Sequence, residues 1–165
     1  MKLGVGIVGC GLIGRRRASV LGVNPLRACA DLDIELAKSL AKSEENCLAS
    51  KDWRDVVNHQ EVDVVIIATP HHMLAEICAG AIEANRHVFL EKPGARFPEE
   101  IKNLIEMCHG KEALVRVGFN HRYHRSFQKL RTIVDSGRLG TLMFIRGRYG
   151  HGGRLGYDQE WRADP

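Results

Sequence analysis

The sequence predicts an α/β fold built on a doubly wound parallel sheet, and three observations indicate it. Short apolar runs alternate with segments whose apolar residues recur at helical spacing, as in βαβ units. A glycine-rich stretch directly follows the first of these runs. The chain has 165 residues, 44% of them hydrophobic and 27% charged, which suits a folded domain of ordinary composition.

Five apolar runs are predicted to form the strands, and a weaker sixth candidate lies near Cys47 and Leu48. The run that begins at Val62 is apolar apart from Asp63, as expected of a central strand covered on both faces. The five runs are residues 3–8, 26–30, 62–68, 87–90 and 114–118.

Three segments between these runs have apolar stripes that predict helices. The clearest covers residues 73–82, and Asn85 follows it in the position of a left-handed cap. A second helix is expected to begin at Pro98, a residue suited to a first helical turn, and to stop at Gly110. A third is expected over residues 34–41.

The pattern changes after Gly118, where a second domain is expected to begin. Ser126 is predicted to cap a helix that Gly137 ends. Residues 141–149 are predicted to form a strand whose unpaired edge would cause the isolated chain to self-associate. We therefore expect one domain over residues 1–120, followed over residues 121–165 by the first helix and strand of an incomplete α/β domain.

Composition argues against several classes of protein. No apolar run approaches the roughly 18 to 20 residues that a membrane helix needs, and the first residues lack the pattern of a signal peptide. We therefore expect no membrane partner and a cytoplasmic protein. The five cysteines are scattered and never spaced as CxxC, which favours reduced thiols over disulfides or a thiolate metal site.

Basic residues and histidines raise two further possibilities, nucleic-acid binding and metal binding. Basic and aromatic residues are interleaved over residues 122–131, but the stripe there is explained by packing within a second domain, so no nucleic-acid partner is expected. Two histidine pairs each lack a third ligand, so no metal site is expected. The pairs are His71 with His72 and His121 with His124.

The glycine-rich stretch reads GCGLIG and comes directly after the first predicted strand. Gly9 permits a tight turn, Gly11 lets the backbone approach a pyrophosphate, and Gly14 allows a helix to pack closely on the strand. Leu12 and Ile13 lie in the first turn of that helix, whose N-terminus favours phosphate charge. The stretch predicts a dinucleotide site, with a plain strand-to-helix turn as the alternative.

Asp31 strengthens the dinucleotide interpretation because it ends the second predicted strand, 17 residues after Gly14. A carboxylate about 20 residues beyond the glycines accepts hydrogen bonds from an adenosine ribose and repels a 2′-phosphate, so NAD is favoured over NADP. Asp33 is the rival for this role, although it lies two residues beyond the strand. The arginines 15–17 are expected to form a solvated helix face, with contact to a phosphate as the alternative.

Two further groups of candidate site residues follow predicted strands. They come after the fourth and fifth strands, if the weak strand near Leu48 is counted as the third. Thr69 and Pro70 end the fourth strand, and Glu91, Lys92 and Pro93 end the fifth. Open α/β sheets bind their ligands at these strand ends, so the residues are expected to face a nicotinamide. Lys92 could then accept a hydroxyl proton during hydride transfer. A surface lysine before a turn proline is equally consistent with the spacing.

Four segments together resemble the Gfo/Idh/MocA family of NAD(P)-dependent oxidoreductases, and the resemblance extends over nearly the whole chain. They are GVGIVGCGLIG at 4–14, ATP at 68–70, HVFLEKPGA at 87–95 and VGFNHRYH at 117–124. The resemblance implies a Rossmann domain joined to an α/β domain with an open antiparallel sheet, commonly in a homo-oligomer. It also implies a dehydrogenase that uses NAD to act on the CH–OH group of a sugar or cyclitol substrate.

The resemblance assigns roles to individual residues. It implies that Lys92 is the catalytic lysine, that Glu91 and Pro93 shape the nicotinamide pocket, and that the Lys92–Pro93 peptide bond is cis. Arg122 matches an arginine that lies near the cofactor or the domain junction. A further pair resembles one that approaches the active site in related dehydrogenases, with a solvated loop as the alternative: Trp161 and Arg162.

The sequence also departs from the family pattern. Many members have Asn and His where this chain has His71 and Leu74, and a frequent proline is replaced by Arg125. His71 is still expected to contact the cofactor. The family's catalytic Asp and His are expected beyond Pro165, so the 165-residue chain alone is expected to be inactive. The alternative function is that of a non-catalytic NAD(H)-binding or scaffolding module.

Overall fold

The computed structural model describes residues 2–42, 44–150, 155, 156 and 159. Residue contacts divide the chain into two units, Met1–Asn120 and His121–Pro165. The first unit contains a parallel sheet, and the second contains one α-helix among its described residues.

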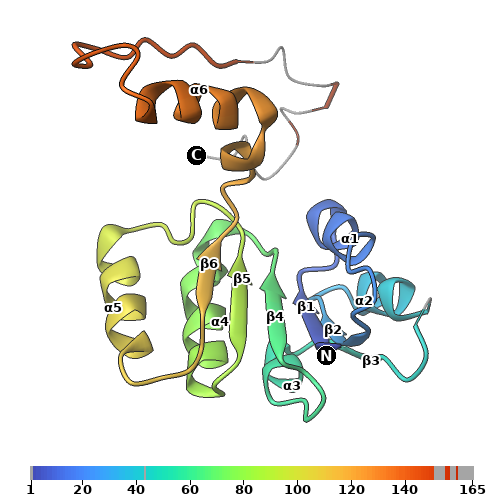
Figure 1. Ribbon diagram of the computed structural model, residues 1–165. Helices are drawn as coiled ribbons and strands as arrows, with labels where there is room; N and C mark the ends of the chain where they lie inside the picture. The colour runs from blue at the N-terminus through green and yellow to red at the C-terminus, as the bar shows by residue number, and fades with distance from the viewer. Residues whose placement is uncertain (1, 43, 151–154, 157–158, 160–165) are drawn as a thin grey trace. The chain divides into compact units, whose positions relative to one another are not determined.

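The sheet has six strands in the order β3-β2-β1-β4-β5-β6, and every neighbouring pair is parallel. Figure 1 shows β6, β5, β4 and β1 in this order across the sheet. The predicted α/β class and the five predicted strands are confirmed, and the weak candidate near Leu48 is β3. The strands are β1 (Val5–Val8), β2 (Leu26–Ala30), β3 (Leu48–Ser50), β4 (Val64–Ile67), β5 (His87–Leu90) and β6 (Val115–Val117).

The strand order reverses between β1 and β4. The chain builds β1, β2 and β3 in one direction and then crosses to β4, which pairs with the other edge of β1. At the carboxyl ends, Val8 lies opposite Ile67. In doubly wound sheets this reversal leaves a crevice beyond the strand ends, where ligands bind. The topology therefore directs attention to the loops that follow β1 and β4.

Five α-helices connect these strands, and the three predicted stripes are all helical. Pro98 is the first residue of its helix, as expected. Asn85 has a positive φ of 54° and directly follows the C-cap Ala84, which confirms the predicted left-handed position. The helices are α1 (Leu12–Ala18), α2 (Ile34–Ala41), α3 (Trp53–Val57), α4 (His71–Glu83) and α5 (Pro98–Cys108).

Side chains of the central strands alternate between two apolar cores, one on each face of the sheet. On β4, Val65 and Ile67 belong to the core completed by α3, α4 and α5. Ile66 belongs to the opposite core, together with residues of β1, β2 and α2. Burial of one such side chain contributes about 1.5–3 kcal/mol, which explains why this strand is apolar at successive positions.

The second unit corrects two predictions. Its helix, α6, spans Arg125–Asp135 and is capped by His124 instead of Ser126. The reason is that Nδ1 of His124 accepts a hydrogen bond from the backbone N–H of Ser126 at 3.3 Å. The strand predicted over residues 141–149 is absent. A strand requires a hydrogen-bonded partner strand, and no described segment pairs with residues 141–149. Because the strand edge is absent, the expected self-association through it has no structural support.

No helix within the described ranges has the length and apolar character that crossing a bilayer requires.

Candidate functional site

The glycine loop connects β1 to α1 at the reversal point of the sheet. Gly9 has a φ of +93°, a left-handed conformation that side chains beyond glycine rarely adopt. Its N–H donates to the carbonyl of Ala30, at the end of β2, at 2.8 Å. A Cβ on Gly9 would lie 2.6 Å from the carbonyl oxygen of Ala68. The loop is thus fixed between the ends of two neighbouring strands, β2 and β4.

Gly11 and Gly14 meet different surroundings. A Cβ on Gly14 would lie 1.9 Å from the carbonyl oxygen of Gly9, so this glycine is required for the helix to pack on the loop. A Cβ on Gly11 would meet nothing within 4 Å. Gly11 is the N-cap of α1, and Leu12 and Ile13 are the first two residues of the helix. No side chain of Gly11 caps the helix. Open space therefore lies over the loop beside the N–H groups of the first helical turn, which lack intrahelical acceptors.

Asp31 lies at the end of β2 and faces the same loop. Its Oδ2 accepts a hydrogen bond from the N–H of Cys10 at 2.7 Å, and its Oδ1 accepts one from the N–H of Asp33 at 3.0 Å. A carboxylate has about four acceptor positions, so two remain. The rival Asp33 is the N-cap of α2, where its side chain accepts from the N–H of Glu35.

Thr69, Pro70 and His71 follow β4, on the other side of the reversal point. The N–H of Ala68 donates to the carbonyl of Val8 at 2.7 Å, which holds this segment beside the glycine loop. Pro70 is the N-cap of α4, and His71 is its first residue. Among the described residues, the Thr69 hydroxyl oxygen is buried and has no hydrogen-bond partner. Such an oxygen is costly to bury, so it is a candidate contact for a ligand.

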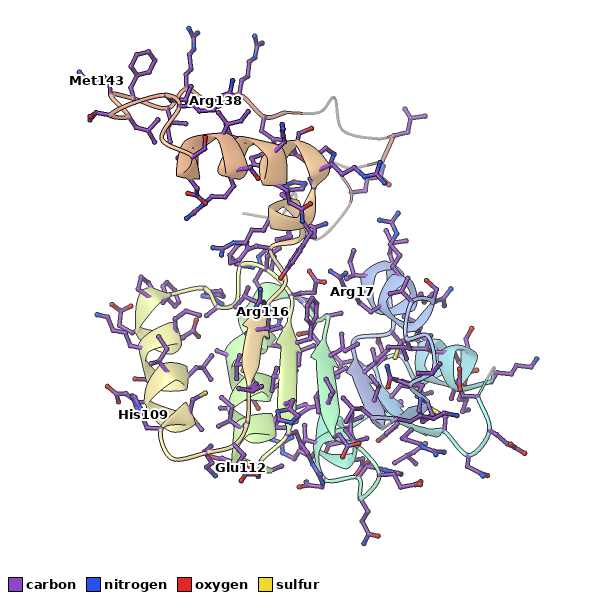
Figure 2. The ribbon with its side chains drawn as sticks, in the orientation of Figure 1. Arg17, His109, Glu112, Arg116, Arg138 and Met143 are labelled. Atoms are coloured by element: carbon purple, nitrogen blue, oxygen red, sulfur yellow. The ribbon has the colours of Figure 1, made fainter. Side chains whose placement is uncertain are left out.

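Glu91 is a buried carboxylate that follows β5 and forms an ion pair with Arg17 of α1. The exposed fraction of Glu91 is only 9%. Nε of Arg17 donates to its Oε1 at 2.7 Å, and Nη2 donates to the same oxygen. The Arg17 guanidinium also lies over the ring of Phe89, 5.0 Å from its centroid. Figure 2 shows Arg17 extending from α1 toward the carboxyl ends of the central strands.

Lys92 lies in a turn that directly follows Glu91. The N–H of Gly94 donates to the carbonyl of Glu91 at 3.1 Å and closes the turn. The peptide bond between Lys92 and Pro93 is cis, which confirms the expectation. The Lys92 side chain is exposed, and no hydrogen bond or ion pair joins its ammonium to the rest of the described chain.

Arg122 lies in the short 3-10 helix η1 (Asn120–Tyr123), at the start of the second unit. Its predicted role near a cofactor stays a prediction. Trp161 and Arg162 lie outside the described residues.

Arg17 is the residue that the sequence reasoning missed, because all three arginines were expected to be solvated. Arg15 and Arg16 are exposed, but Arg17 is half-buried. A signal was present in the spacing. Gly14 must face the sheet, and a residue three positions later lies on the same face of a helix, which selects Arg17 from the three.

Burial and neighbouring thiols raise the pKa of two cysteines, Cys29 and Cys47. A side-chain hydrogen bond with Cys10, together with burial, raises the pKa of the Cys29 thiol to about 12. A side-chain hydrogen bond with Cys29 likewise raises the pKa of Cys47. Thiolates are the form that attacks substrates and binds metals, so these cysteines are poorly suited to either role. Within the described ranges, no group of three or more His, Cys, Asp or Glu residues could hold a metal ion.

The arrangement fits a dinucleotide on three observations of this structure. Space is open over Gly11, a buried hydroxyl on Thr69 lacks a partner, and the Asp31 carboxylate has acceptor positions left. These residues follow β1, β4 and β2, which are neighbours in the sheet.

Curated proteins of similar sequence include dehydrogenases named for levoglucosan and for inositol. A levoglucosan dehydrogenase from Pseudarthrobacter phenanthrenivorans is 30% identical over 99% of this chain and 43% of its own length. An inositol 2-dehydrogenase from Salmonella paratyphi B is 35% identical over 90% of this chain and 46% of its own length. The chain therefore spans less than half the length of these relatives.

Solved structures agree with these sequence comparisons. A scyllo-inositol dehydrogenase from Lactobacillus casei with bound NAD(H) and scyllo-inositol superposes with a TM-score of 0.78 at 26% identity, covering 85% of this chain and 43% of that chain. A levoglucosan dehydrogenase in complex with NADH and levoglucosan gives a TM-score of 0.77 at 29% identity, covering 85% and 41%.

The model of the Gfo/Idh/MocA oxidoreductase family, with its NAD-binding Rossmann fold, matches residues 3–119, which are most of the chain. The fold and the relatives agree with this match, and the chain belongs to the Gfo/Idh/MocA family of oxidoreductases with an NAD-binding Rossmann fold.

Proposed function

We propose that this chain binds NAD(H) and is the nucleotide-binding part of a dehydrogenase that acts on the CH–OH group of a sugar or cyclitol. One observation carries the proposal. The glycine loop, Asp31, Thr69 and the Glu91–Lys92 turn all follow the carboxyl ends of adjacent parallel strands. A dinucleotide has to span such an edge, with its two halves on either side of the reversal point.

The adenosine half would bind at the end of β2. The backbone N–H groups around Gly11 would hold the diphosphate, because the space there is open and the helix N-terminus favours anions. The two remaining acceptor positions of Asp31 would take the ribose hydroxyls. Because a carboxylate repels a 2′-phosphate, we propose NAD as the cofactor in preference to NADP.

The nicotinamide half would bind near the ends of β4 and β5. There the Thr69 hydroxyl would gain the hydrogen bond that it lacks, and Glu91 with Pro93 would form part of the pocket wall. When bound, the nicotinamide supplies the hydride donor or acceptor. Lys92 would hold the hydroxyl proton of the substrate, because its amine is exposed and has no partner among the described residues.

The substrate class is proposed from the named relatives. Levoglucosan and the inositols are ring-shaped molecules with several hydroxyl groups, and the relatives in question act on or bind them. We propose a cyclic polyol of this kind for the protein to which the chain belongs.

The test is a titration of the chain with NADH, followed by the change in nicotinamide fluorescence. We expect saturable binding that Asp31→Ala weakens by at least about tenfold, which corresponds to about 1.4 kcal/mol. Asp33→Ala is the matched control, because it removes a helix cap two residues away and should leave NADH affinity within about twofold. No binding by the unsubstituted chain, or equal binding by the Asp31→Ala chain, would contradict the proposal.

The second candidate is NAD(H) binding without turnover. It is favoured by the observation that Lys92 has no acidic or imidazole partner among the described residues, whereas the resemblance implies an Asp and a His. An assay with NAD and a panel of inositols and anhydrosugars separates the two candidates. Turnover that is lost in Lys92→Ala supports the enzyme, and cofactor binding with no turnover supports the binding module.

A further inference from the structure

The ion pair between Arg17 and Glu91 lies one residue from Lys92, and neither the binding of a dinucleotide nor proton transfer by Lys92 explains it. We infer that Arg17 is a positioning residue for Lys92: it holds the Glu91 carboxylate against α1 and so keeps that carboxylate from pairing with the Lys92 ammonium. The inference rests on the proposed role of Lys92, and it adds a determinant on a different element of the fold.

The contacts of Arg17 define a single position for the carboxylate. Two nitrogens of the guanidinium donate to the same oxygen of Glu91, and the guanidinium lies over the Phe89 ring. The side chains of Arg17 and Glu91 are 27% and 11% exposed, so water does little to weaken their attraction. A planar guanidinium that both stacks and donates from two nitrogens fixes direction as well as charge.

Glu91 needs a cationic partner because its carboxylate is buried. An unpaired carboxylate at this depth loses much of its hydration, and a nearby cation is the means of compensation. If Arg17 is removed, the adjacent residue in the chain is a lysine. Its ammonium sits on a flexible four-carbon stem and has no partner among the described residues. Lys92 is therefore the expected replacement partner.

Such a replacement would impair the proposed chemistry of Lys92. A carboxylate in contact with an ammonium stabilises the charged form of the lysine and restrains its stem. A proton acceptor has to reach its neutral form and has to approach the substrate hydroxyl. Arg17 therefore keeps Lys92 both free to move and free to change charge.

The backbone around Glu91 is fixed by contacts that do not involve Arg17. The N–H of Glu91 donates to the carbonyl of Ile67 on β4 at 3.0 Å, and its carbonyl accepts from Gly94 at 3.1 Å. Removing Arg17 would thus free the carboxylate while the strand end and the turn stay in place. This separation makes the inference testable.

The experiment measures how fast individual lysines are acetylated by a small amount of acetic anhydride, in the folded 165-residue chain without cofactor. Lys102, an exposed residue of α5, is the internal reference in the mass spectrum. We expect the rate at Lys92, relative to Lys102, to fall at least threefold in Arg17→Met, because the ammonium pairs with Glu91. The rate should return in Arg17→Met with Glu91→Gln, and it should stay near the original value in Arg17→Lys.

A purely structural role for Arg17 gives the opposite result. Loosening of the turn would raise the rate at Lys92, and Glu91→Gln would not restore it. An unchanged or higher rate in Arg17→Met, or a fall that persists in the double variant, would overturn the inference. Should Arg17→Met fail to fold by circular dichroism, Arg17→Gln keeps N–H donors without the charge, and we expect a smaller fall in the same direction. An unchanged rate there overturns the inference equally.

The same samples are titrated with NADH to separate this inference from the proposed function. Absence of NADH binding by the unsubstituted chain would contradict the proposed function, whereas the acetylation result concerns only Arg17, Glu91 and Lys92.

Discussion

The carboxylate of Asp31 and the backbone N–H of Cys10 form a hydrogen bond of 2.7 Å. It joins the end of β2 to the turn that follows β1, so the ribose and diphosphate parts of the proposed site are held together before a cofactor binds. A second hydrogen bond, from the N–H of Asp33, sets the orientation of the same carboxylate. Binding to an arrangement formed in advance avoids part of the entropic cost of ordering a loop.

Asp31→Asn tests whether this carboxylate discriminates between NADH and NADPH. Asparagine keeps an acceptor oxygen for the N–H of Cys10 but loses the charge that repels a 2′-phosphate. We expect the ratio of the two dissociation constants to shift toward NADPH by at least about tenfold. Asp33→Asn should retain the cap of α2 and the original ratio. If the two variants behave alike, Asp31 does not set the preference.

Gly11→Ala and Gly14→Ala separate binding from folding. A Cβ at position 11 meets open space, and the backbone there is extended. We therefore expect the free energy of unfolding of Gly11→Ala to stay within about 0.5 kcal/mol of that of the original chain. The methyl group would occupy the space proposed for the diphosphate and should weaken NADH binding at least about tenfold.

Gly14→Ala should show the reverse pattern. Its Cβ would lie 1.9 Å from a backbone oxygen of Gly9, so α1 has to move away from the loop. We expect a loss of several kcal/mol, of the kind that overpacking and strain produce. Urea unfolding measures both variants. Unchanged NADH binding by Gly11→Ala would contradict the proposed position of the diphosphate.

We expect the buried thiol of Cys78 to lower the folding stability of the chain at alkaline pH. Burial in the core raises the pKa of its thiol from 9.0 to about 12, so between these values the unfolded chain releases a proton that the folded chain keeps. The folded state therefore loses stability as pH rises above 9, by up to about 1.4 kcal/mol per pH unit. Urea unfolding at pH 8 and pH 10 should show a smaller pH dependence for Cys78→Ala than for the original chain. Equal dependence in both chains would mean that this thiol ionises as readily when folded.

We expect Arg17→Leu to lower the folding stability of the chain, and Arg16→Leu serves as a close control. The substitution removes the two hydrogen bonds from Arg17 to Glu91, whose side chain is 11% exposed. Because the flexible Lys92 ammonium replaces them only in part, we expect a cost of about 1–3 kcal/mol. Arg16→Leu alters an exposed neighbour on the same helix and should stay within about 0.5 kcal/mol. Thermal unfolding with a matched Glu91→Gln variant completes a double-mutant cycle. No coupling between positions 17 and 91 would contradict the ion pair.

The elements that sequence predicted well are those whose signals are local. An apolar run such as residues 62–68 has to be buried on both faces, and the left-handed residue at Asn85 follows from its position after a stripe. The glycine loop was equally readable, because Gly9 and Gly14 are required by backbone geometry alone.

The predictions that were wrong depended on distant or competing partners. Residues 141–149 have strand-like composition, but a strand exists only where another segment completes its ladder. Ser126 is a good cap by type, yet His124 lies nearer the helix start and provides an acceptor. Arg17 was assigned to solvent because its partner, Glu91, lies 74 residues away in the chain. Helix α3 was not predicted, because its five residues are too few to show a helical repeat of apolar positions.

The measurement that bears most directly on this account is a crystal structure of the chain with NADH. We predict diphosphate density above Gly11, both adenosine ribose hydroxyls within hydrogen-bond distance of Asp31, and the pyridine ring beside Lys92. A cofactor bound away from the glycine turn, or a Lys92 side chain directed into bulk water with the ring elsewhere, would contradict it.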